Sequence, residues 1–257
     1  DSLRTFRQLH SQCAGHPEYG YAPGIETTTG PLGQGITNGV GFAMAEKLMA
    51  DQFNKPGHDI VNHHTYVFMG DGCLMEGISH ESISLAGHLN LNKLIVLFDD
   101  NSVSIDGPTS LSTSENHLKR FKSCNWNAQK INGHNFAQIY NALKKAKVSS
   151  KPSFIACKTI IGFGSPNKQG KNSSHGAALG PEEVEKTRKK LKWNYPPFFI
   201  PKNILNLWKE TSIKGKKENR KWSLNFKKNK KKKEFLNYLK KQIPKDAFAE
   251  FENLKNI

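Results

Sequence analysis

The sequence has no long apolar run, few cysteines and a shortage of acidic side chains. None of its 257 residues belongs to an apolar stretch that approaches the roughly 18 residues a membrane-spanning helix needs. Its start carries Arg4 and Arg7 with no apolar segment behind them, which argues against a secretory signal peptide. The 4 cysteines lie far apart with no C-x-x-C pair, so neither a disulfide framework nor a zinc site is predicted. We therefore expect a soluble protein of a reducing, cytoplasmic compartment.

The net charge of +16 is concentrated towards the end of the sequence. Residues 209–257 carry 16 basic and 6 acidic side chains, and residues 227–233 are almost all lysine. Aromatic and apolar side chains recur around this lysine run at nearly helical spacing. That pattern favours amphipathic helices with a solvated basic face and disfavours a nucleic-acid site. We expect a lysine-rich helical linker or tail over residues 196–257.

Residues 1–195 show the alternation of strands and helices that is typical of one large α/β domain. Apolar periodicity predicts strands over residues 65–69, 93–98 and 153–158, and helices over residues 2–9, 36–53, 79–88 and 137–146. The strands are continuously apolar, which predicts a parallel sheet with helices on both faces. Such sheets bind ligands beyond the carboxyl ends of their strands. The first residue is Asp1 rather than methionine, so we expect the sequence to be part of a longer protein.

Two polar segments follow neighbouring predicted strands. Asp71 supplies a carboxylate between two glycines, where a backbone can approach a phosphate closely, and Asn101 supplies an amide oxygen. Together with the backbone carbonyl of Val103 and the oxygens of a diphosphate, they suit Mg²⁺. Two ordinary turns are the alternative, and Gly-Asp-Gly alone would favour it. A following Asp-Asn about thirty residues later, after an apolar strand, is much more restrictive.

Residues 70–77 and 99–101 together resemble the thiamine-diphosphate motif of transketolases. Further segments resemble the same family in the right order, over residues 15–18, 26–35, 158–165 and 174–176. The resemblance extends over residues 3–210, and the set is specific to transketolases rather than to thiamine enzymes in general.

The resemblance implies a thiamine-diphosphate-binding fold with a divalent metal, Mg²⁺, for which Ca²⁺ or Mn²⁺ can substitute. Asp71, Asn101 and the Val103 carbonyl would bind the metal, and Gly72 and Asn101 would contact the diphosphate. Three neighbouring residues would approach the rings of the cofactor, namely Gly30, Pro31 and Leu32, and Ile105 would join Leu32 as an apolar wall of the thiazolium.

His16 and His175 match histidines that line the substrate channel of the family. There they bind oxygens of the donor sugar and assist proton transfer, and His175 also contacts the cofactor. The other histidines are interpreted as surface or packing residues. Glu76 and Glu81 fall at a predicted helix start, where they either stabilise the helix or help to join two subunits, and both interpretations stay open.

The family transfers a two-carbon ketol unit from a ketose phosphate to an aldose phosphate in the pentose phosphate pathway. The sugar phosphates are of the xylulose 5-phosphate, ribose 5-phosphate and sedoheptulose 7-phosphate class. The active site lies between two chains of a dimer, in which a separate domain holds the aminopyrimidine ring. We expect the present sequence to lack the opening segment of the family and the pyrimidine domain, and to be inactive alone. Ala178 also replaces the usual proline. There are two alternatives to a transketolase. One is dihydroxyacetone synthase, and the other is a catalytically silent remnant that binds partners or polyanions.

Overall fold

A computed structural model of the chain describes residues 2–240. Within them, residues 2–47 and 63–201 form one compact unit, here called the sheet unit. Residues 48–62 and 202–240 form a second, here called the tail unit. The predicted boundary at residue 195 stays a prediction, and residues 241–257 of the predicted tail lie outside the described residues. No helix within the described range is long and apolar enough to cross a membrane.

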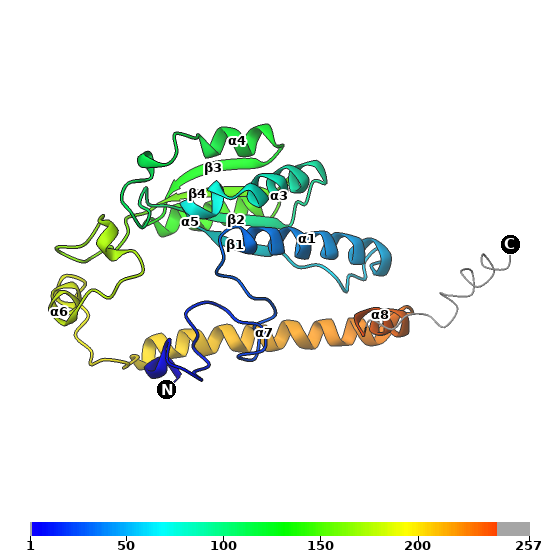
Figure 1. The fold of residues 1–257 in the computed structure, drawn as a ribbon. Helices are drawn as coiled ribbons and strands as arrows, with labels where there is room; N and C mark the ends of the chain where they lie inside the picture. The colour runs from blue at the N-terminus through cyan, green and yellow to red at the C-terminus, as the bar shows by residue number, and fades with distance from the viewer. Residues whose placement is uncertain (1, 241–257) are drawn as a thin grey trace. The chain divides into compact units, whose positions relative to one another are not determined.

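The sheet unit is built on four parallel strands in the order β1-β2-β4-β3 (Figure 1). They are β1 (Thr65–Met69), β2 (Leu94–Asp100), β3 (Asn127–Asn132) and β4 (Ser153–Lys158). The central strands β2 and β4 are mostly buried, which accounts for their continuous apolar sequences.

Two hydrophobic clusters show that helices cover both faces of the sheet. Val96 and Phe98 of β2 belong to a cluster with α1 (Gln34–Phe53), α3 (Gly77–His88) and α4 (His117–Ser123). Ile95 and Leu97 of the same strand belong to a cluster with α5 (Phe136–Ala146), on the opposite face. Successive side chains of β2 thus alternate between the two layers. The predicted α/β class, a parallel sheet with helices on both faces, is confirmed.

The helices of the sheet unit agree with the sequence at most positions. They are η1 (Ser2–Thr5), α1 (Gln34–Phe53, whose end belongs to the tail unit), α2 (Asp71–Met75), α3 (Gly77–His88), η2 (Thr109–Leu111), α4 (His117–Ser123), α5 (Phe136–Ala146), η3 (Asn172–Ser174) and α6 (Pro181–Lys190). The helix predicted over residues 2–9 is wrong beyond its first turn. Arg7 and His10 have φ values of 60° and 64°, which no right-handed helix accommodates.

The tail unit has a small hydrophobic core of its own, formed with α7 (Lys202–Lys228) and α8 (Lys232–Leu239). The ring of Phe53 meets the ring of Phe235 edge-on at 5.1 Å between centroids. Trp222 stacks on Phe226 at 4.8 Å, and its indole N–H donates to the carbonyl of Ile60 at 2.8 Å. These contacts confirm the prediction of amphipathic helices around the lysine run.

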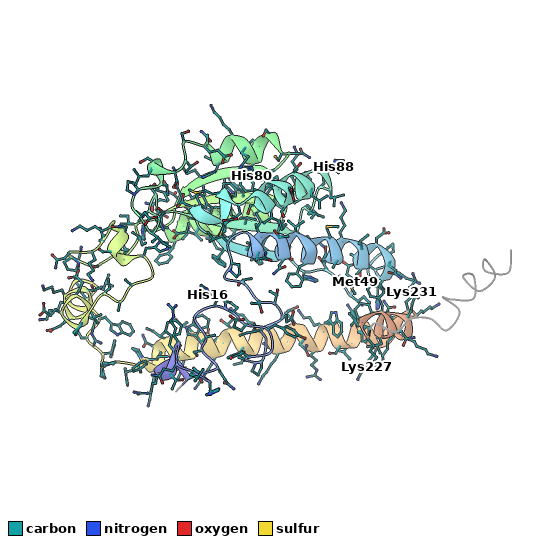
Figure 2. All side chains as sticks on the ribbon, viewed as in Figure 1. His16, Met49, His80, His88, Lys227 and Lys231 are labelled. Atoms are coloured by element: carbon teal, nitrogen blue, oxygen red, sulfur yellow. The ribbon has the colours of Figure 1, made fainter. Side chains whose placement is uncertain are left out.

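The lysine run, residues 227–233, covers the end of α7, a turn of residues 229–231 and the start of α8. Asn229 at its centre is buried and donates from its side chain to the carbonyl of Phe53 at 3.3 Å. The ammonium group of Lys231, labelled in Figure 2, donates to the carbonyl of Gln52 at 2.6 Å. The other lysines of the run are exposed, so the run forms a solvated basic face over a packed turn.

We expect Phe235→Ala to unfold the tail unit locally. The side chain of Phe235 is 5% exposed, and truncation of such a residue costs about 3–5 kcal/mol, a large loss for a small core. Leu239→Ala, on the same helix but 54% exposed, is the matched control. Hydrogen exchange should accelerate at the amides of α8 in the first variant alone, with β2 unchanged in both. Equal protection of α8 in the two variants would contradict the described packing.

We also expect nucleic-acid binding by the lysine run to be weak and to collapse with salt. Exposed lysines bind phosphates through counterion release, which carries no base specificity. Fluorescence anisotropy with duplexes of unrelated sequence should show affinity lost between about 50 mM and about 200 mM salt. Sequence-dependent binding that persists at physiological salt would contradict this expectation.

Candidate functional site

The carboxyl ends of β1, β2 and β4 meet at one edge of the sheet. Their register pairs Met69 with Phe98, and Phe98 with Ala156. Asp71 begins α2 directly after β1, Asn101 follows β2, and the segment of residues 159–176 follows β4. Parallel pairing therefore directs three loops to the same edge of the sheet, as the sequence predicted for the loops after β1 and β2.

A cavity of about 530 Å³ is lined by these loops. It brings together most of the residues that the sequence singled out, namely Leu32, Asp71, Gly72, Asn101, Val103, Ile105 and His175. Gly30, Pro31 and His16 are not among its lining residues. No role was predicted for two further lining residues, Asp99 and Ser174, although both lie inside the motifs that carry the family resemblance.

The carboxylate of Asp71 is buried and incompletely paired. Asp71 is 8% exposed, and its Oδ2 atom has no hydrogen-bond partner. Burial, followed by the negative charges of Asp100 and Asp99, raises the pKa of Asp71 to about 6. A buried carboxylate with a free oxygen is costly unless a cation or a donor joins it. The environment of Asp71 therefore fits a metal ligand.

The side chain of Asn101 is oriented by its neighbours. Its Nδ2 donates to Oδ2 of Asp99 at 2.9 Å, and its Oδ1 accepts the backbone N–H of Val103 at 2.9 Å. The hydroxyl of Thr159 donates to the other oxygen of Asp99. An amide oxygen has two lone pairs, so Oδ1 of Asn101 keeps one for a further partner.

Asp100 is engaged at the sheet edge by two lysines. Its carboxylate pairs with Lys130 at 2.9 Å and with Lys158 at 3.6 Å. Within residues 2–240, no group of three or more histidine, cysteine, aspartate or glutamate side chains could hold a metal. A metal at Asp71 would thus take one carboxylate and otherwise neutral or ligand-derived oxygens, a donor set that suits Mg²⁺ bound with a phosphate.

Apolar side chains form the other wall of the cavity. Leu32 lies over Gly72, where an added Cβ would come within 3.2 Å of the Leu32 side chain. Leu32 is 50% exposed and Ile105 is 70% exposed, so both present apolar surface.

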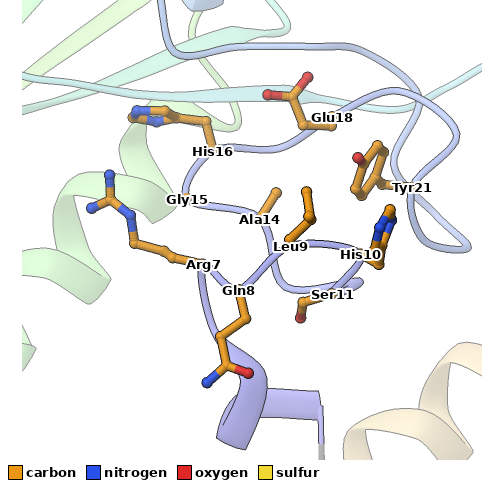
Figure 3. Close-up of a pocket in the computed structure, with 10 residues that line it drawn as sticks. All are labelled: Arg7, Gln8, Leu9, His10, Ser11, Ala14, Gly15, His16, Glu18 and Tyr21. Carbon is orange, nitrogen blue, oxygen red and sulfur yellow. The ribbon is translucent and has the colours of Figure 1, made fainter.

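His16 lies in a second pocket of about 570 Å³ in the N-terminal segment. Figure 3 shows its imidazole on the same side of this pocket as the guanidinium of Arg7. His16 also packs against Gly30, which has a φ of +145° and where an added Cβ would lie 2.9 Å from the imidazole. Gly30 lies two residues before Leu32, and Leu32 lines the Asp71 cavity. His16 therefore contacts the segment that carries Leu32 to this cavity.

His175 reaches the cavity from the segment after β4. Its backbone N–H donates to the carbonyl of Asn172 at 2.8 Å, and the Asn172 side chain donates to the carbonyl of Ile105 at 3.2 Å. His175 is exposed and therefore open to a ligand.

Other side chains considered in the sequence lie outside the cavity lining. Glu76 is the N-cap residue of α3, but its side chain makes no capping hydrogen bond, and Glu81 is exposed. His117 packs edge-on against Phe98 at 5.4 Å, and His134 stacks on a phenylalanine ring, which fits packing roles.

Comparison with known proteins gives one consistent match. A family model described as the transketolase thiamine diphosphate binding domain matches residues 1–245. A transketolase of Vibrio vulnificus is 58% identical over 219 residues, which are 85% of this chain and 33% of that protein. The structure of a transketolase from Leishmania mexicana has a TM-score of 0.86 at 42% identity, covering 89% of this chain and 34% of that one. The structure of a Pichia stipitis transketolase in complex with sedoheptulose 7-phosphate has a TM-score of 0.86 at 41% identity. The match covers 91% of this chain and 35% of that one.

The chain spans about a third of the length of these relatives. The family model nevertheless extends over almost all of it, and the fold agrees with that of the solved relatives. The chain therefore belongs to the transketolase family, as its thiamine diphosphate binding domain.

Proposed function

We propose that the cavity at Asp71 binds the diphosphate of thiamine diphosphate together with a divalent metal, and that the chain is the diphosphate-binding part of a transketolase. The observation that carries the proposal is the buried carboxylate of Asp71, with its unpartnered Oδ2 beside a cavity that Asn101 also lines. Retention of this arrangement favours a cofactor-binding role over a silent remnant.

The metal would be held by Asp71, Asn101 and the carbonyl of Val103, with Mg²⁺ as the expected ion and Ca²⁺ or Mn²⁺ as substitutes. Gly72 and Asn101 would contact the diphosphate, because a glycine backbone leaves room for a phosphate. The single carboxylate leaves the charge of the ion to be balanced mainly by the diphosphate, which is the usual arrangement for Mg²⁺.

The rings of the cofactor would meet the apolar side of the cavity. Leu32 and Ile105 supply exposed apolar surface there. Gly30 and Pro31 lie outside the lining, so their role would be to shape the turn that presents Leu32.

Thiamine diphosphate, when bound, would supply the chemistry that lets a two-carbon ketol unit pass from a ketose phosphate to an aldose phosphate. His175 would bind donor-sugar oxygens and move protons near the cofactor, and His16 would do so from the pocket of the N-terminal segment. Imidazole can perform both tasks near neutral pH. The relative solved with sedoheptulose 7-phosphate supports this class of substrate.

The remaining residues of the enzyme would come from the part of the relatives that this chain does not span. That part would include the domain that holds the aminopyrimidine ring. The enzyme would be a homodimer whose active sites lie between chains. The pentose phosphate pathway and a reducing, cytoplasmic setting belong to the same proposal. The names of the relatives favour transketolase over dihydroxyacetone synthase.

We expect Asp71→Ala to abolish metal-dependent binding of thiamine diphosphate, and His175→Ala to spare it. Loss of the carboxylate leaves only neutral protein oxygens to hold the ion against the diphosphate charge, whereas His175 faces the substrate side. Calorimetric titration with and without Mg²⁺ separates the two variants, with Asp71→Asn added to remove the charge at nearly constant shape. Equal loss in Asp71→Ala and His175→Ala, or unchanged Mg²⁺-dependent binding in Asp71→Ala, means that the metal site is assigned wrongly.

We further expect residues 1–257 alone to show no transketolase turnover. Ketol transfer from xylulose 5-phosphate to ribose 5-phosphate should be measured with saturating cofactor and Mg²⁺. Addition of a separately expressed pyrimidine domain should restore it, and His175→Ala should then lower the rate by about 10²–10⁴-fold, as for a positioned proton-transfer group. Multiple turnover by the pure chain would be the contrary outcome.

A further inference from the structure

We propose that Glu183 is a positioning residue that holds the segment of residues 162–175, and with it His175, at the Asp71 cavity. The consequence for ligand binding rests on the proposed function. Glu183 itself is not among the residues that line the cavity, so any effect it has on a ligand passes through the segment.

Both carboxylate oxygens of Glu183 accept hydrogen bonds from this segment. It lies in the first turn of α6 and is 6% exposed. Its Oε1 accepts the backbone N–H of Asn167 at 2.7 Å and the hydroxyl proton of Ser165, and its Oε2 accepts Nδ2 of Asn167 at 2.8 Å. The hydrogen bond from Ser165 and the two from Asn167 lower the pKa of Glu183 to about 2. Glu183 is therefore an ionised acceptor at neutral pH, which makes these hydrogen bonds strong.

The hydrogen bonds continue from Ser165 to the edge of the cavity. Its Oγ accepts the backbone N–H of Lys168 at 3.2 Å, and the carbonyl of Lys168 accepts the hydroxyl of Ser174 at 2.6 Å. Ser174 also lies tightly over Gly162, where an added Cβ would be 2.7 Å from its Oγ. Ser174 and the next residue, His175, both line the cavity.

The far end of the segment is tied to the apolar wall. Asn172 accepts the backbone N–H of His175 and donates from its own side chain to the carbonyl of Ile105. The segment is thus held at one end by Glu183 and at the other by the residue proposed to contact the thiazolium. Release of either end would let His175 move relative to the cofactor.

A comparison with Glu182 distinguishes this role from a general effect of negative charge at the start of α6. Both glutamates lie in the first turn, where a carboxylate is favourable to the helix dipole. Glu182 is exposed, while Glu183 is buried against the segment. Glu182→Gln is therefore the matched control for Glu183→Gln.

The experiment compares these variants in the full chain by hydrogen exchange and by NMR resonances of the His175 ring, with calorimetric titration of thiamine diphosphate with Mg²⁺ as a check of cofactor binding. Glu183→Gln removes the negative charge and one acceptor oxygen, so the charge-assisted hydrogen bonds from Ser165 and Asn167 are weakened or lost. We expect exchange at the amides of residues 165–175 to accelerate at least tenfold while β2 and β4 stay protected, and the ring resonances of His175 to shift, whereas cofactor affinity should change little, as in His175→Ala. Glu182→Gln should match the wild type in every measurement.

A reciprocal pair provides a rescue. Asn167→Asp alone sets two carboxylates against each other and should behave like Glu183→Gln. In the double variant Asn167→Asp/Glu183→Gln, the amide of residue 183 can donate to the new carboxylate, which restores the side-chain pair with its direction reversed. We expect the double variant to recover part of the protection and to return the His175 ring resonances towards those of the wild type.

Unchanged exchange of the segment in Glu183→Gln would overturn the inference. Accelerated exchange with unchanged His175 ring resonances would reduce Glu183 to a structural role and would also overturn it. Failure of the wild type to bind would contradict the proposed function instead. The positioning role is then decided by NMR resonances of the His175 ring, which should shift in Glu183→Gln and not in Glu182→Gln.

Discussion

The parallel pairing of β1, β2 and β4 is the constraint on which the site depends. Asp71 and Asn101 are brought to one edge because their strands run in the same direction and in a fixed register. The hydrophobic layers hold that register. A slip of β2 by one residue would exchange Val96 and Phe98 with Ile95 and Leu97, and so move each pair into the wrong layer. The relative position of a carboxylate and an amide is thereby set by apolar packing rather than by any contact between the two.

The central part of the fold could be predicted from the sequence because its strands are apolar and separated by helices. The bounds of β1 and β4 agree with the prediction, and α5 differs by one residue at its start. The edge strand β3 was missed, because Asn127–Asn132 is mainly polar and only partly buried, with little apolar signal. The helix expected over residues 2–9 failed for the opposite reason. Its residues suit a helix, but the backbone turns at Arg7, whose N–H donates to the carbonyl of Cys13 at 2.8 Å.

The parts of the site that sequence reasoning could reach are those that lie in short motifs. Asp71 and Asn101 were assigned from their positions after strands, and they do line one cavity. Asp99, which orients Asn101, lies in the same motif but was given no role, because its hydrogen bond to that amide is a matter of side-chain geometry. Glu183 could not be found at all. It reads as an ordinary acidic residue of a helix start, and its partners Ser165 and Asn167 belong to a segment whose path the sequence does not reveal.

The two sides of the cavity are completed to different degrees by this chain. The polar side is built in, since Asp71 is buried and Asn101 is oriented by Asp99. The apolar side is open, because Leu32 and Ile105 are half or more exposed. Full burial of such a side chain is worth about 1.5–3 kcal/mol, and here at least half of that gain is not realised. Under the proposed function, the chain itself would recognise the metal and the diphosphate, while the affinity for an apolar ring would depend on a further surface over Leu32 and Ile105.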